Sequence, residues 1–173
     1  MYSNYAILHI HYQNFLKKLL NIENNMKKVL AIASGGGHWV QLLRLLPAFK
    51  EHEITFVSTN EVFSNMVSPY TFYTVADSNR KSTMSILRSV VAVMRIVFKV
   101  RPDIIITTGA APGLMFICVG KLMGAKTIWV DSIANVEKIS MSGQIASKMA
   151  DRTYTQWPEL SNEKIIYSGN VIS

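Results

Sequence analysis

Residues 29–38 read Val-Leu-Ala-Ile-Ala-Ser-Gly-Gly-Gly-His. The first five residues form an apolar run typical of a buried strand, and residues 38–49 repeat apolar side chains at helical spacing. Glycines between a strand and a helix let the main chain approach a ligand closely, and the free N–H groups of a helix start favour an anion. The stretch therefore predicts a strand, a turn and a helix, with a phosphate or diphosphate as the natural guest. The alternative is a plain turn.

The rest of the chain continues the same alternation of strands and helices. Strands are predicted at residues 29–33, 54–58, 72–75, 104–107, 127–130, 152–155 and 165–167, and helices at residues 38–49, 84–100, 112–123 and 143–150. Such alternation indicates a parallel sheet with helices on both faces. The predicted fold class is α/β, a single Rossmann-like domain, and 173 residues are enough for one such core.

The first 25 residues are set apart from this domain. They contain no apolar run long enough for a signal sequence or a membrane span, whereas Met26-Lys27-Lys28 opens directly into the first strand. We expect residues 26–173 to form the domain. Residues 1–25 are expected to be an extension outside the functional protein or a loosely attached helix, and the alternative is an interfacial anchor through residues 16–20.

Three loops rich in small residues follow predicted strands. They are residues 34–38, 107–113 and 131–135. Ligands of such sheets bind outside the carboxyl ends of the strands, so the three loops are expected to converge on one site. The first loop is not a P-loop, because no Gly-Lys-Ser/Thr follows it. It is also a poor dinucleotide motif, because Val40 stands at the third glycine position and no ribose-binding acid follows, which speaks against an oxidoreductase.

Two side chains in these loops are candidates for acid–base chemistry. His38 ends the glycine turn, where an imidazole can take a proton from an attacking hydroxyl or donate to a phosphate oxygen. Asp131 ends a strand, where a carboxylate can orient a hydroxyl or act as a base. The alternatives are a histidine satisfied by the helix start and an acid that caps the following segment.

Positive charge is concentrated in one window. Residues 80–101 carry six of the seven net positive charges and no acid. Within the predicted helix 84–100, Arg88, Arg95 and Lys99 share one face, and apolar residues cover most of the rest. Such a helix is typical of contact with an anionic membrane surface, and the alternative is a wide core-facing helix. Nucleic acid is not expected as a partner, because Phe98 is the only aromatic residue of the window.

The composition narrows the remaining chemistry. Cys118 is the only cysteine and lies in an apolar run, so we expect a buried hydrophobe rather than a reactive thiol. The sequence contains no Cys/His cluster with metal-ligand spacing. We therefore expect neither a metal nor a cofactor.

Five segments in this order resemble one known family. They are Ser34-Gly35-Gly36-Gly37-His38 with residues 42–46, residues 101–109, Val130-Asp131-Ser132, Met149-Ala150-Asp151-Arg152, and Gln156-Trp157-Pro158-Glu159-Leu160. Together they resemble the acceptor-binding half of MurG-like glycosyltransferases, which belong to family 28 with GT-B architecture. The likeness extends to members of the family whose two halves are separate chains. These are the membrane subunit of the eukaryotic two-chain dolichol-diphosphate N-acetylglucosamine transferase and the PssD-like bacterial proteins of polysaccharide synthesis.

The resemblance implies roles for particular residues. The acceptor diphosphate is expected at the first and second loops, through Ser34, Gly35, Gly36, Gly37, Gly109 and Gly113. His38 and Asp131 are the expected catalytic residues, although single-chain relatives commonly have glutamate near the position of Asp131. Residues 167–171 resemble the point where single-chain relatives cross into the donor domain. The resemblance thus implies a single N-terminal-type half of a GT-B fold.

The function expected from this resemblance is that of a glycosyltransferase subunit in capsular or exopolysaccharide biosynthesis. It would bind a polyprenyl-diphosphate-linked sugar, while a donor-binding partner subunit holds a nucleotide sugar such as a UDP-sugar. The chain is expected to be inactive without that partner and to lie peripherally on the cytoplasmic face of the inner membrane. The alternative is a non-catalytic membrane anchor and activator of the partner glycosyltransferase.

Overall fold

The computed structural model describes residues 25–49, 51–76 and 83–171. The N-terminal extension proposed for residues 1–25 therefore lies almost wholly outside the described residues. The strands are β1 (Lys28–Ala33), β2 (Glu53–Ser58), β3 (Thr71–Thr74), β4 (Ile104–Thr107), β5 (Lys126–Val130), β6 (Arg152–Thr155) and β7 (Ile165–Tyr167). The helices are α2 (Gly37–Arg44), α3 (Thr83–Val100), α4 (Ala110–Leu122) and α5 (Met141–Ala146), with the short 3-10 turns η1 (Leu46–Phe49), η2 (Glu61–Met66) and η3 (Pro158–Leu160).

The described strands form one seven-stranded parallel sheet in the order β3-β2-β1-β4-β5-β6-β7. This confirms the predicted α/β Rossmann-like class, and every predicted strand is present. The helix bounds were less accurate. The helix predicted over 38–49 breaks after Arg44, because Pro47 has no N–H to continue the α-helical ladder. The helix predicted over 143–150 begins at Met141, where the Ser140 hydroxyl caps it by accepting the N–H of Gly143.

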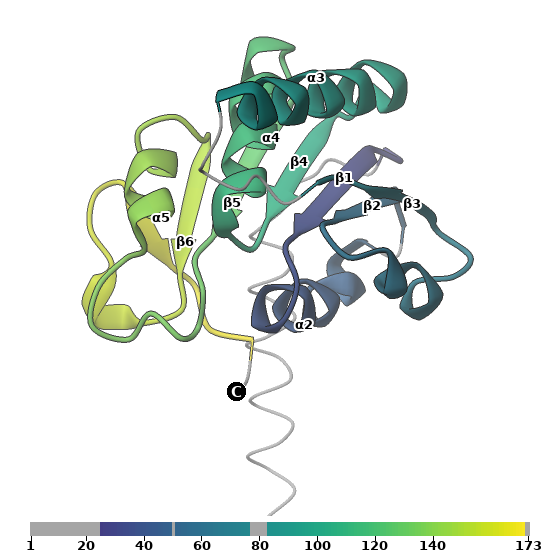
Figure 1. Ribbon diagram of the computed structural model, residues 1–173. Helices are drawn as coiled ribbons and strands as arrows, with labels where there is room; N and C mark the ends of the chain where they lie inside the picture. The colour runs from purple at the N-terminus through teal and green to yellow at the C-terminus, as the bar shows by residue number, and fades with distance from the viewer. Residues whose placement is uncertain (1–24, 50, 77–82, 172–173) are drawn as a thin grey trace, which may run out of the picture.

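Helices cover both faces of the sheet, and each face has its own apolar core (Figure 1). On one face, α2 packs through Trp39, Leu42 and Leu45. On the opposite face, α3, α4 and α5 pack against the sheet, with Phe116 and Ile117 of α4 fully buried at the centre. The chain therefore crosses from one face to the other between the first helix and the later ones.

The strand order reverses between β1 and β4. Strands β2 and β3 follow β1 on one side, and β4 to β7 continue on the other. The loops after β1 and β4 lead to α2 and α4, which lie on opposite faces of the sheet (Figure 1). A crevice opens where neighbouring strands diverge in this way, and ligands of doubly wound folds bind there. The first and second predicted loops flank this position.

Candidate functional site

The first glycine loop leads into an uncapped helix. Gly36 is the N-cap residue of α2 with φ 68°, and no side chain of the described residues caps the helix. Gly36 and Gly37 are exposed, whereas Ser34 and Gly35 are half-buried. A Cβ atom at Gly36 or Gly37 would meet nothing within 4 Å. Open space thus lies beside these two glycines at an uncapped helix start, and the unpaired amides of a helix start favour an anion.

The imidazole of His38 is held against the second loop. Its Nδ1 lies 2.8 Å from the carbonyl oxygen of Thr108, and the Thr108 hydroxyl donates to the His38 carbonyl at 2.7 Å. Because a carbonyl only accepts, Nδ1 carries the proton in this arrangement. In the neutral ring, Nε2 is then the unprotonated nitrogen. It forms no hydrogen bond with any described residue, so its lone pair is free to accept a proton.

Gly109 provides the surface on which this ring rests. Its φ is 132°, and a Cβ at this position would lie 2.6 Å from Cε1 and 2.7 Å from Nδ1 of His38. Both its backbone conformation and the neighbouring ring therefore require glycine. The next residue, Ala110, has φ 68°, which a residue with a side chain rarely adopts. Such strained residues collect at functional loops.

The second loop differs from its prediction in two details. The helix α4 begins at Ala110, so Pro112 is its third residue and not its first. Gly113 is buried in α4, and a Cβ there would overlap Oγ1 of Thr107. Close packing of α4 on β4 thus accounts for this glycine. The predicted contact of Gly113 with a diphosphate stays a prediction that this geometry does not favour.

Asp131 has the environment of a structural residue. It is 2% exposed. Its Oδ1 accepts from Nε1 of Trp129 at 3.1 Å and from Oγ of Ser140 at 2.6 Å. Its Oδ2 accepts from Nδ2 of Asn135 at 2.9 Å and from the amide of Ser140 at 3.0 Å. Four donors occupy the carboxylate, and Ser140 is the N-cap residue of α5. The geometry therefore favours the alternative, an acid that supports the following segment, over a general base.

The three loops follow β1, β4 and β5 at one edge of the sheet, as predicted. His38 joins the first loop to the second, and two glutamines that the sequence reasoning did not single out contact the third. Gln41 of α2 donates to the carbonyl of Asp131 at 3.0 Å and accepts from the amide of Ile133 at 3.1 Å. Gln156 donates to the same carbonyl at 3.1 Å. A polar residue on the buried side of an amphipathic helix was the available signal for Gln41, since buried amides need partners.

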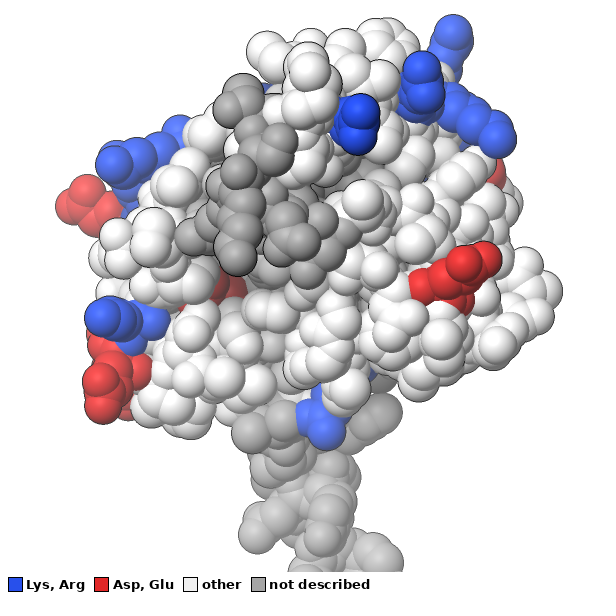
Figure 2. Space-filling view, in the orientation of Figure 1, with Lys and Arg blue, Asp and Glu red and all other residues white. Residues whose placement is uncertain are grey.

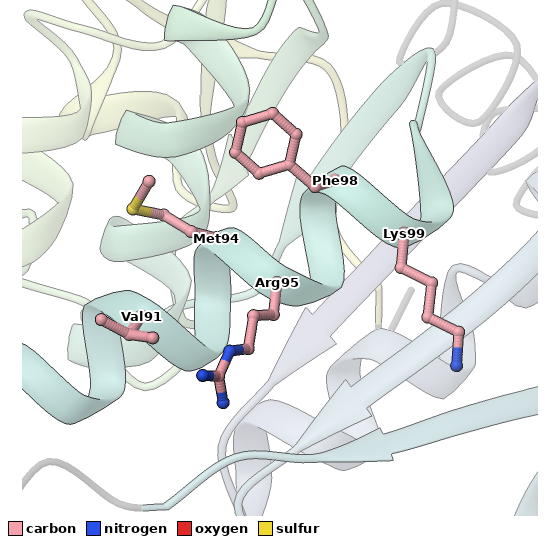
Figure 3. Close-up of a pocket in the computed structure, with 5 residues that line it drawn as sticks. All are labelled: Val91, Met94, Arg95, Phe98 and Lys99. Carbon is pink, nitrogen blue, oxygen red and sulfur yellow. The ribbon is translucent and has the colours of Figure 1, made fainter.

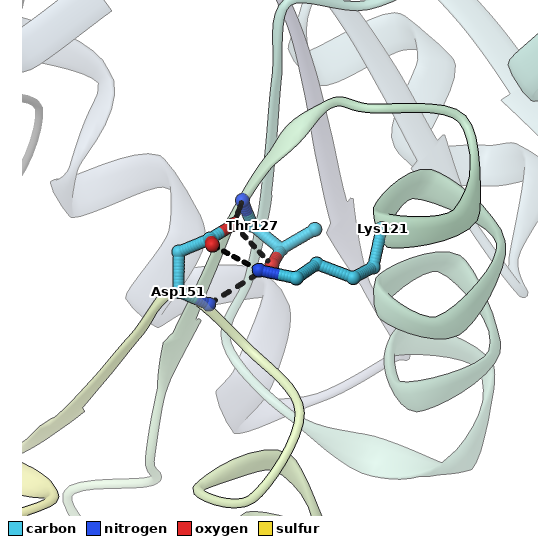
Figure 4. Close-up of polar contacts among 3 residues, drawn as sticks. All are labelled: Lys121, Thr127 and Asp151. Carbon is cyan, nitrogen blue, oxygen red and sulfur yellow. Dashed lines mark hydrogen bonds and ion pairs between the residues drawn. The ribbon is translucent and has the colours of Figure 1, made fainter.

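A second polar cluster lies at the opposite edge of the sheet, where β5 and β6 begin. Asp151 pairs with Lys121 and accepts from the amide of Thr127 at 2.8 Å and from its hydroxyl at 2.9 Å (Figure 4). Burial acts to raise the pKa of Asp151, but the bonds from Lys121 and Thr127 outweigh it and hold the pKa below its usual range. The cluster ties α4, β5 and β6 together and is remote from the glycine loops.

The outer face of α3 is apolar with a basic edge. Arg88, Arg95 and Lys99 are exposed, and basic side chains gather over this helix (Figure 2). Next to them lies an exposed stripe at alternating spacings of three and four: Met84, Leu87, Val91, Met94 and Phe98. Figure 3 shows Met94 and Phe98 pointing to one side of the helix and Arg95 and Lys99 to the other, and these four residues line a shallow groove together with Val91. No helix among the described residues is both long and apolar enough to cross a bilayer. Arg80 and Lys81 lie outside the described residues.

Cys118 and the metal-ligating side chains add no further site. Cys118 is half-buried, its Sγ lies 3.9 Å from Sδ of Met149, and burial raises the pKa of its thiol. Within residues 25–49, 51–76 and 83–171, no three His, Cys, Asp or Glu side chains are grouped so that they could hold a metal ion.

This geometry places the chain in a structural class. The described domain superposes on MurG of Acinetobacter baumannii with a TM-score of 0.68, at 14% identity, over 83% of this chain and 46% of that one. It superposes on UDP-N-acetylglucosamine 2-epimerase of Rickettsia bellii with a TM-score of 0.63, at 15% identity, over 86% of this chain and 46% of that one. The chain therefore has the fold of one half of a GT-B protein, and it spans about half the length of these solved structures.

Sequence comparison then gives the family. Residues 59–171 match the family described as oligosaccharide biosynthesis protein Alg14 like, and the chain belongs to this family. The human UDP-N-acetylglucosamine transferase subunit ALG14 is 28% identical over 83% of this chain and 82% of its own length. The subunit of the same name from Schizosaccharomyces pombe is 38% identical over 36% of this chain and 32% of its own length. The chain is thus a member of a family of glycosyltransferase subunits.

Proposed function

We propose that this chain is the acceptor-binding subunit of a two-chain glycosyltransferase that uses UDP-N-acetylglucosamine. A separate donor-binding subunit would hold the nucleotide sugar, and this chain would hold a sugar linked to a lipid diphosphate. Two findings support the division: the relatives are named as UDP-N-acetylglucosamine transferase subunits, and the domain covers 46% of each of the two solved structures described above. One domain alone cannot enclose and align two substrates.

The observation that carries the proposal is the uncapped start of α2. Gly36 and Gly37 are exposed next to the switch point of the sheet, and a Cβ at either position would meet nothing within 4 Å. A diphosphate of the acceptor would accept hydrogen bonds from the amides of this helix start and be stabilised by the helix dipole. Ser34 and Gly35 would line the same loop, and Gly109 would approach it beneath the ring of His38. Gly113 and Asp131 are left out of direct contact for the reasons given above.

His38 is the proposed general base. The acceptor hydroxyl would give its proton to Nε2 while its oxygen attacks the anomeric carbon of the sugar donor. The bond from that carbon to the nucleotide diphosphate would break, and the diphosphate would leave with the bonding electrons, which inverts the configuration. In the neutral ring, the bond from Nδ1 to the Thr108 carbonyl leaves the lone pair on Nε2, which is the nitrogen that would take this proton.

The test is an assay of the complex with its partner, a lipid-diphosphate acceptor and UDP-N-acetylglucosamine. His38→Asn retains an N–H that can donate to Thr108 but has no basic nitrogen, so kcat is expected to fall by about 10² to 10⁴. Thr108→Val, which keeps the accepting carbonyl, is the matched control and should lose far less. An unchanged kcat for His38→Asn would remove this residue from the chemistry, and absence of transfer by the wild-type complex would refute the function.

The basic edge and apolar stripe of α3 are proposed to contact an anionic membrane surface peripherally. Arg88, Arg95 and Lys99 together should contribute about 3 kcal/mol to binding, at about 1 kcal/mol each near such a surface. Replacing all three by glutamine should weaken sedimentation with vesicles containing phosphatidylglycerol by roughly 100-fold. The matched control replaces the exposed Lys138, Lys148 and Lys164, which removes the same charge elsewhere. Equal binding of both triple variants would refute the contact.

The biological setting and the non-catalytic alternative need their own tests. Synthesis of a bacterial capsule or exopolysaccharide at the inner membrane rests on the sequence resemblance alone. A neighbouring gene for a donor-binding subunit within a polysaccharide operon would support it. If the chain only anchors and activates its partner, the partner tethered artificially to membranes will have full activity alone. Under the present proposal it will have none.

A further inference from the structure

We infer that Gln41 and Gln156 are positioning residues that fix the loop of residues 131–135 relative to His38. The inference rests on the proposed function, because it assigns that loop to the acceptor site. Both side chains are buried, at 2% and 1% exposure. Their Nε2 atoms donate to the same acceptor, the carbonyl oxygen of Asp131, at 3.0 Å from Gln41 and 3.1 Å from Gln156. One carbonyl is thus held from two directions.

The other end of each amide is also engaged. Oε1 of Gln41 accepts from the amide of Ile133 at 3.1 Å, and Oε1 of Gln156 accepts from the amide of Val171 at 2.9 Å. Since each amide donates at one end and accepts at the other, neither can flip without losing both bonds. A buried amide that loses its partner is destabilised, so the two side chains lock their loop in one arrangement.

The hydrogen bonds of Gln41 link the loop of residues 131–135 to the helix that carries the proposed base. Gln41 lies three residues after His38 on α2, so the helix that carries the imidazole also carries one of the two positioning glutamines. Nε1 of Trp157 adds a third bond to the loop, to the carbonyl of Ile133 at 2.9 Å. The half-buried Ser132 and Asn135 and the exposed Ala134 are therefore held at a set position relative to α2, the helix that follows the first glycine loop. A sugar joined to a diphosphate at Gly36 and Gly37 would extend toward this loop, which we assign to acceptor binding.

Two substitutions of Gln41 test this in the complex with its partner. Gln41→Leu removes both bonds, so the acceptor KM should rise at least about tenfold while the KM for the nucleotide sugar stays constant. Gln41→Glu restores both bonds only when its carboxyl is protonated. The ratio of its acceptor KM to that of the wild type should therefore fall toward one as the pH is lowered from about 8 to about 5. Gln144→Leu is the matched control, because Gln144 is exposed on α5, and its acceptor KM should not change.

Hydrogen exchange gives a readout that does not depend on activity. Amides of residues 132–139 should exchange faster in Gln41→Leu and in the second variant, Gln156→Leu, than in wild type. Folded variants with unchanged acceptor KM and unchanged exchange would overturn the inference, and so would a parallel loss of both KM values. If the wild-type complex transfers no sugar, the proposed function fails. Faster exchange would then still support the claim that Gln41 and Gln156 fix this loop, and unchanged exchange would still refute that claim.

Discussion

Gly37→Ala separates ligand binding from folding more cleanly than any other change in the first loop. Gly37 is exposed, has no positive φ, and is the first residue of α2. A methyl group there meets no atom of the described protein within 4 Å. The substitution should therefore stabilise the fold by about 0.4–1 kcal/mol, because alanine restricts the unfolded chain. For a domain of this size the Tm should rise by about 1–4 °C.

The same methyl group would stand where the diphosphate is proposed to approach. Loss of one hydrogen bond to a charged oxygen costs about 1.5–3 kcal/mol, which corresponds to a roughly 10- to 150-fold higher acceptor KM. The assay compares initial rates of the complex over a range of lipid-diphosphate acceptor concentrations, together with thermal unfolding of each variant. Gly36→Ala is the contrasting variant, because φ 68° makes alanine cost about 1–2 kcal/mol in stability. A stable Gly37→Ala complex with the wild-type acceptor KM would refute the placement of the diphosphate.

Three further predictions concern the scaffold. Gly113→Ala should destabilise the fold by about 1–3 kcal/mol in urea unfolding, because its Cβ would overlap the Thr107 hydroxyl. Asp151→Asn should cost about 1 kcal/mol at neutral pH. Because folding lowers the pKa of Asp151, this loss should shrink as the pH falls below about 4, and a gap that widens in acid would contradict it. Burial raises the pKa of Cys118, so the native chain should react with iodoacetamide more slowly than the urea-unfolded chain.

The sheet could be predicted from sequence because its strands are short apolar runs bounded by turns. All seven predicted strands are present, and β4, β6 and β7 have the predicted bounds. Helix bounds were harder, since they depend on caps and breaks. The prediction for residues 38–49 followed apolar spacing across Pro47, and η2 was not predicted because a short 3-10 turn has no periodic signal.

Convergence of the three loops could also be predicted, because parallel strands end at one edge. The partners of individual side chains could not. The same loop position suits a catalytic acid or a structural one, and only the four donors around Asp131 separate the two. Likewise, a glycine after a strand suggests a ligand, but Gly113 serves helix packing against Thr107. Contacts between residues far apart in the chain decide these cases, and no local pattern records them.

The contact between His38 and Gly109 restricts how members of this family can diverge. The imidazole fills the volume in which a side chain at position 109 would begin. The two positions therefore cannot vary independently during evolution, although they are distant along the chain. Homologues that carry a residue larger than glycine at position 109 should have replaced the histidine at position 38 first. An alignment in which many sequences combine a larger residue at position 109 with an intact histidine at position 38 would show that the ring can move aside.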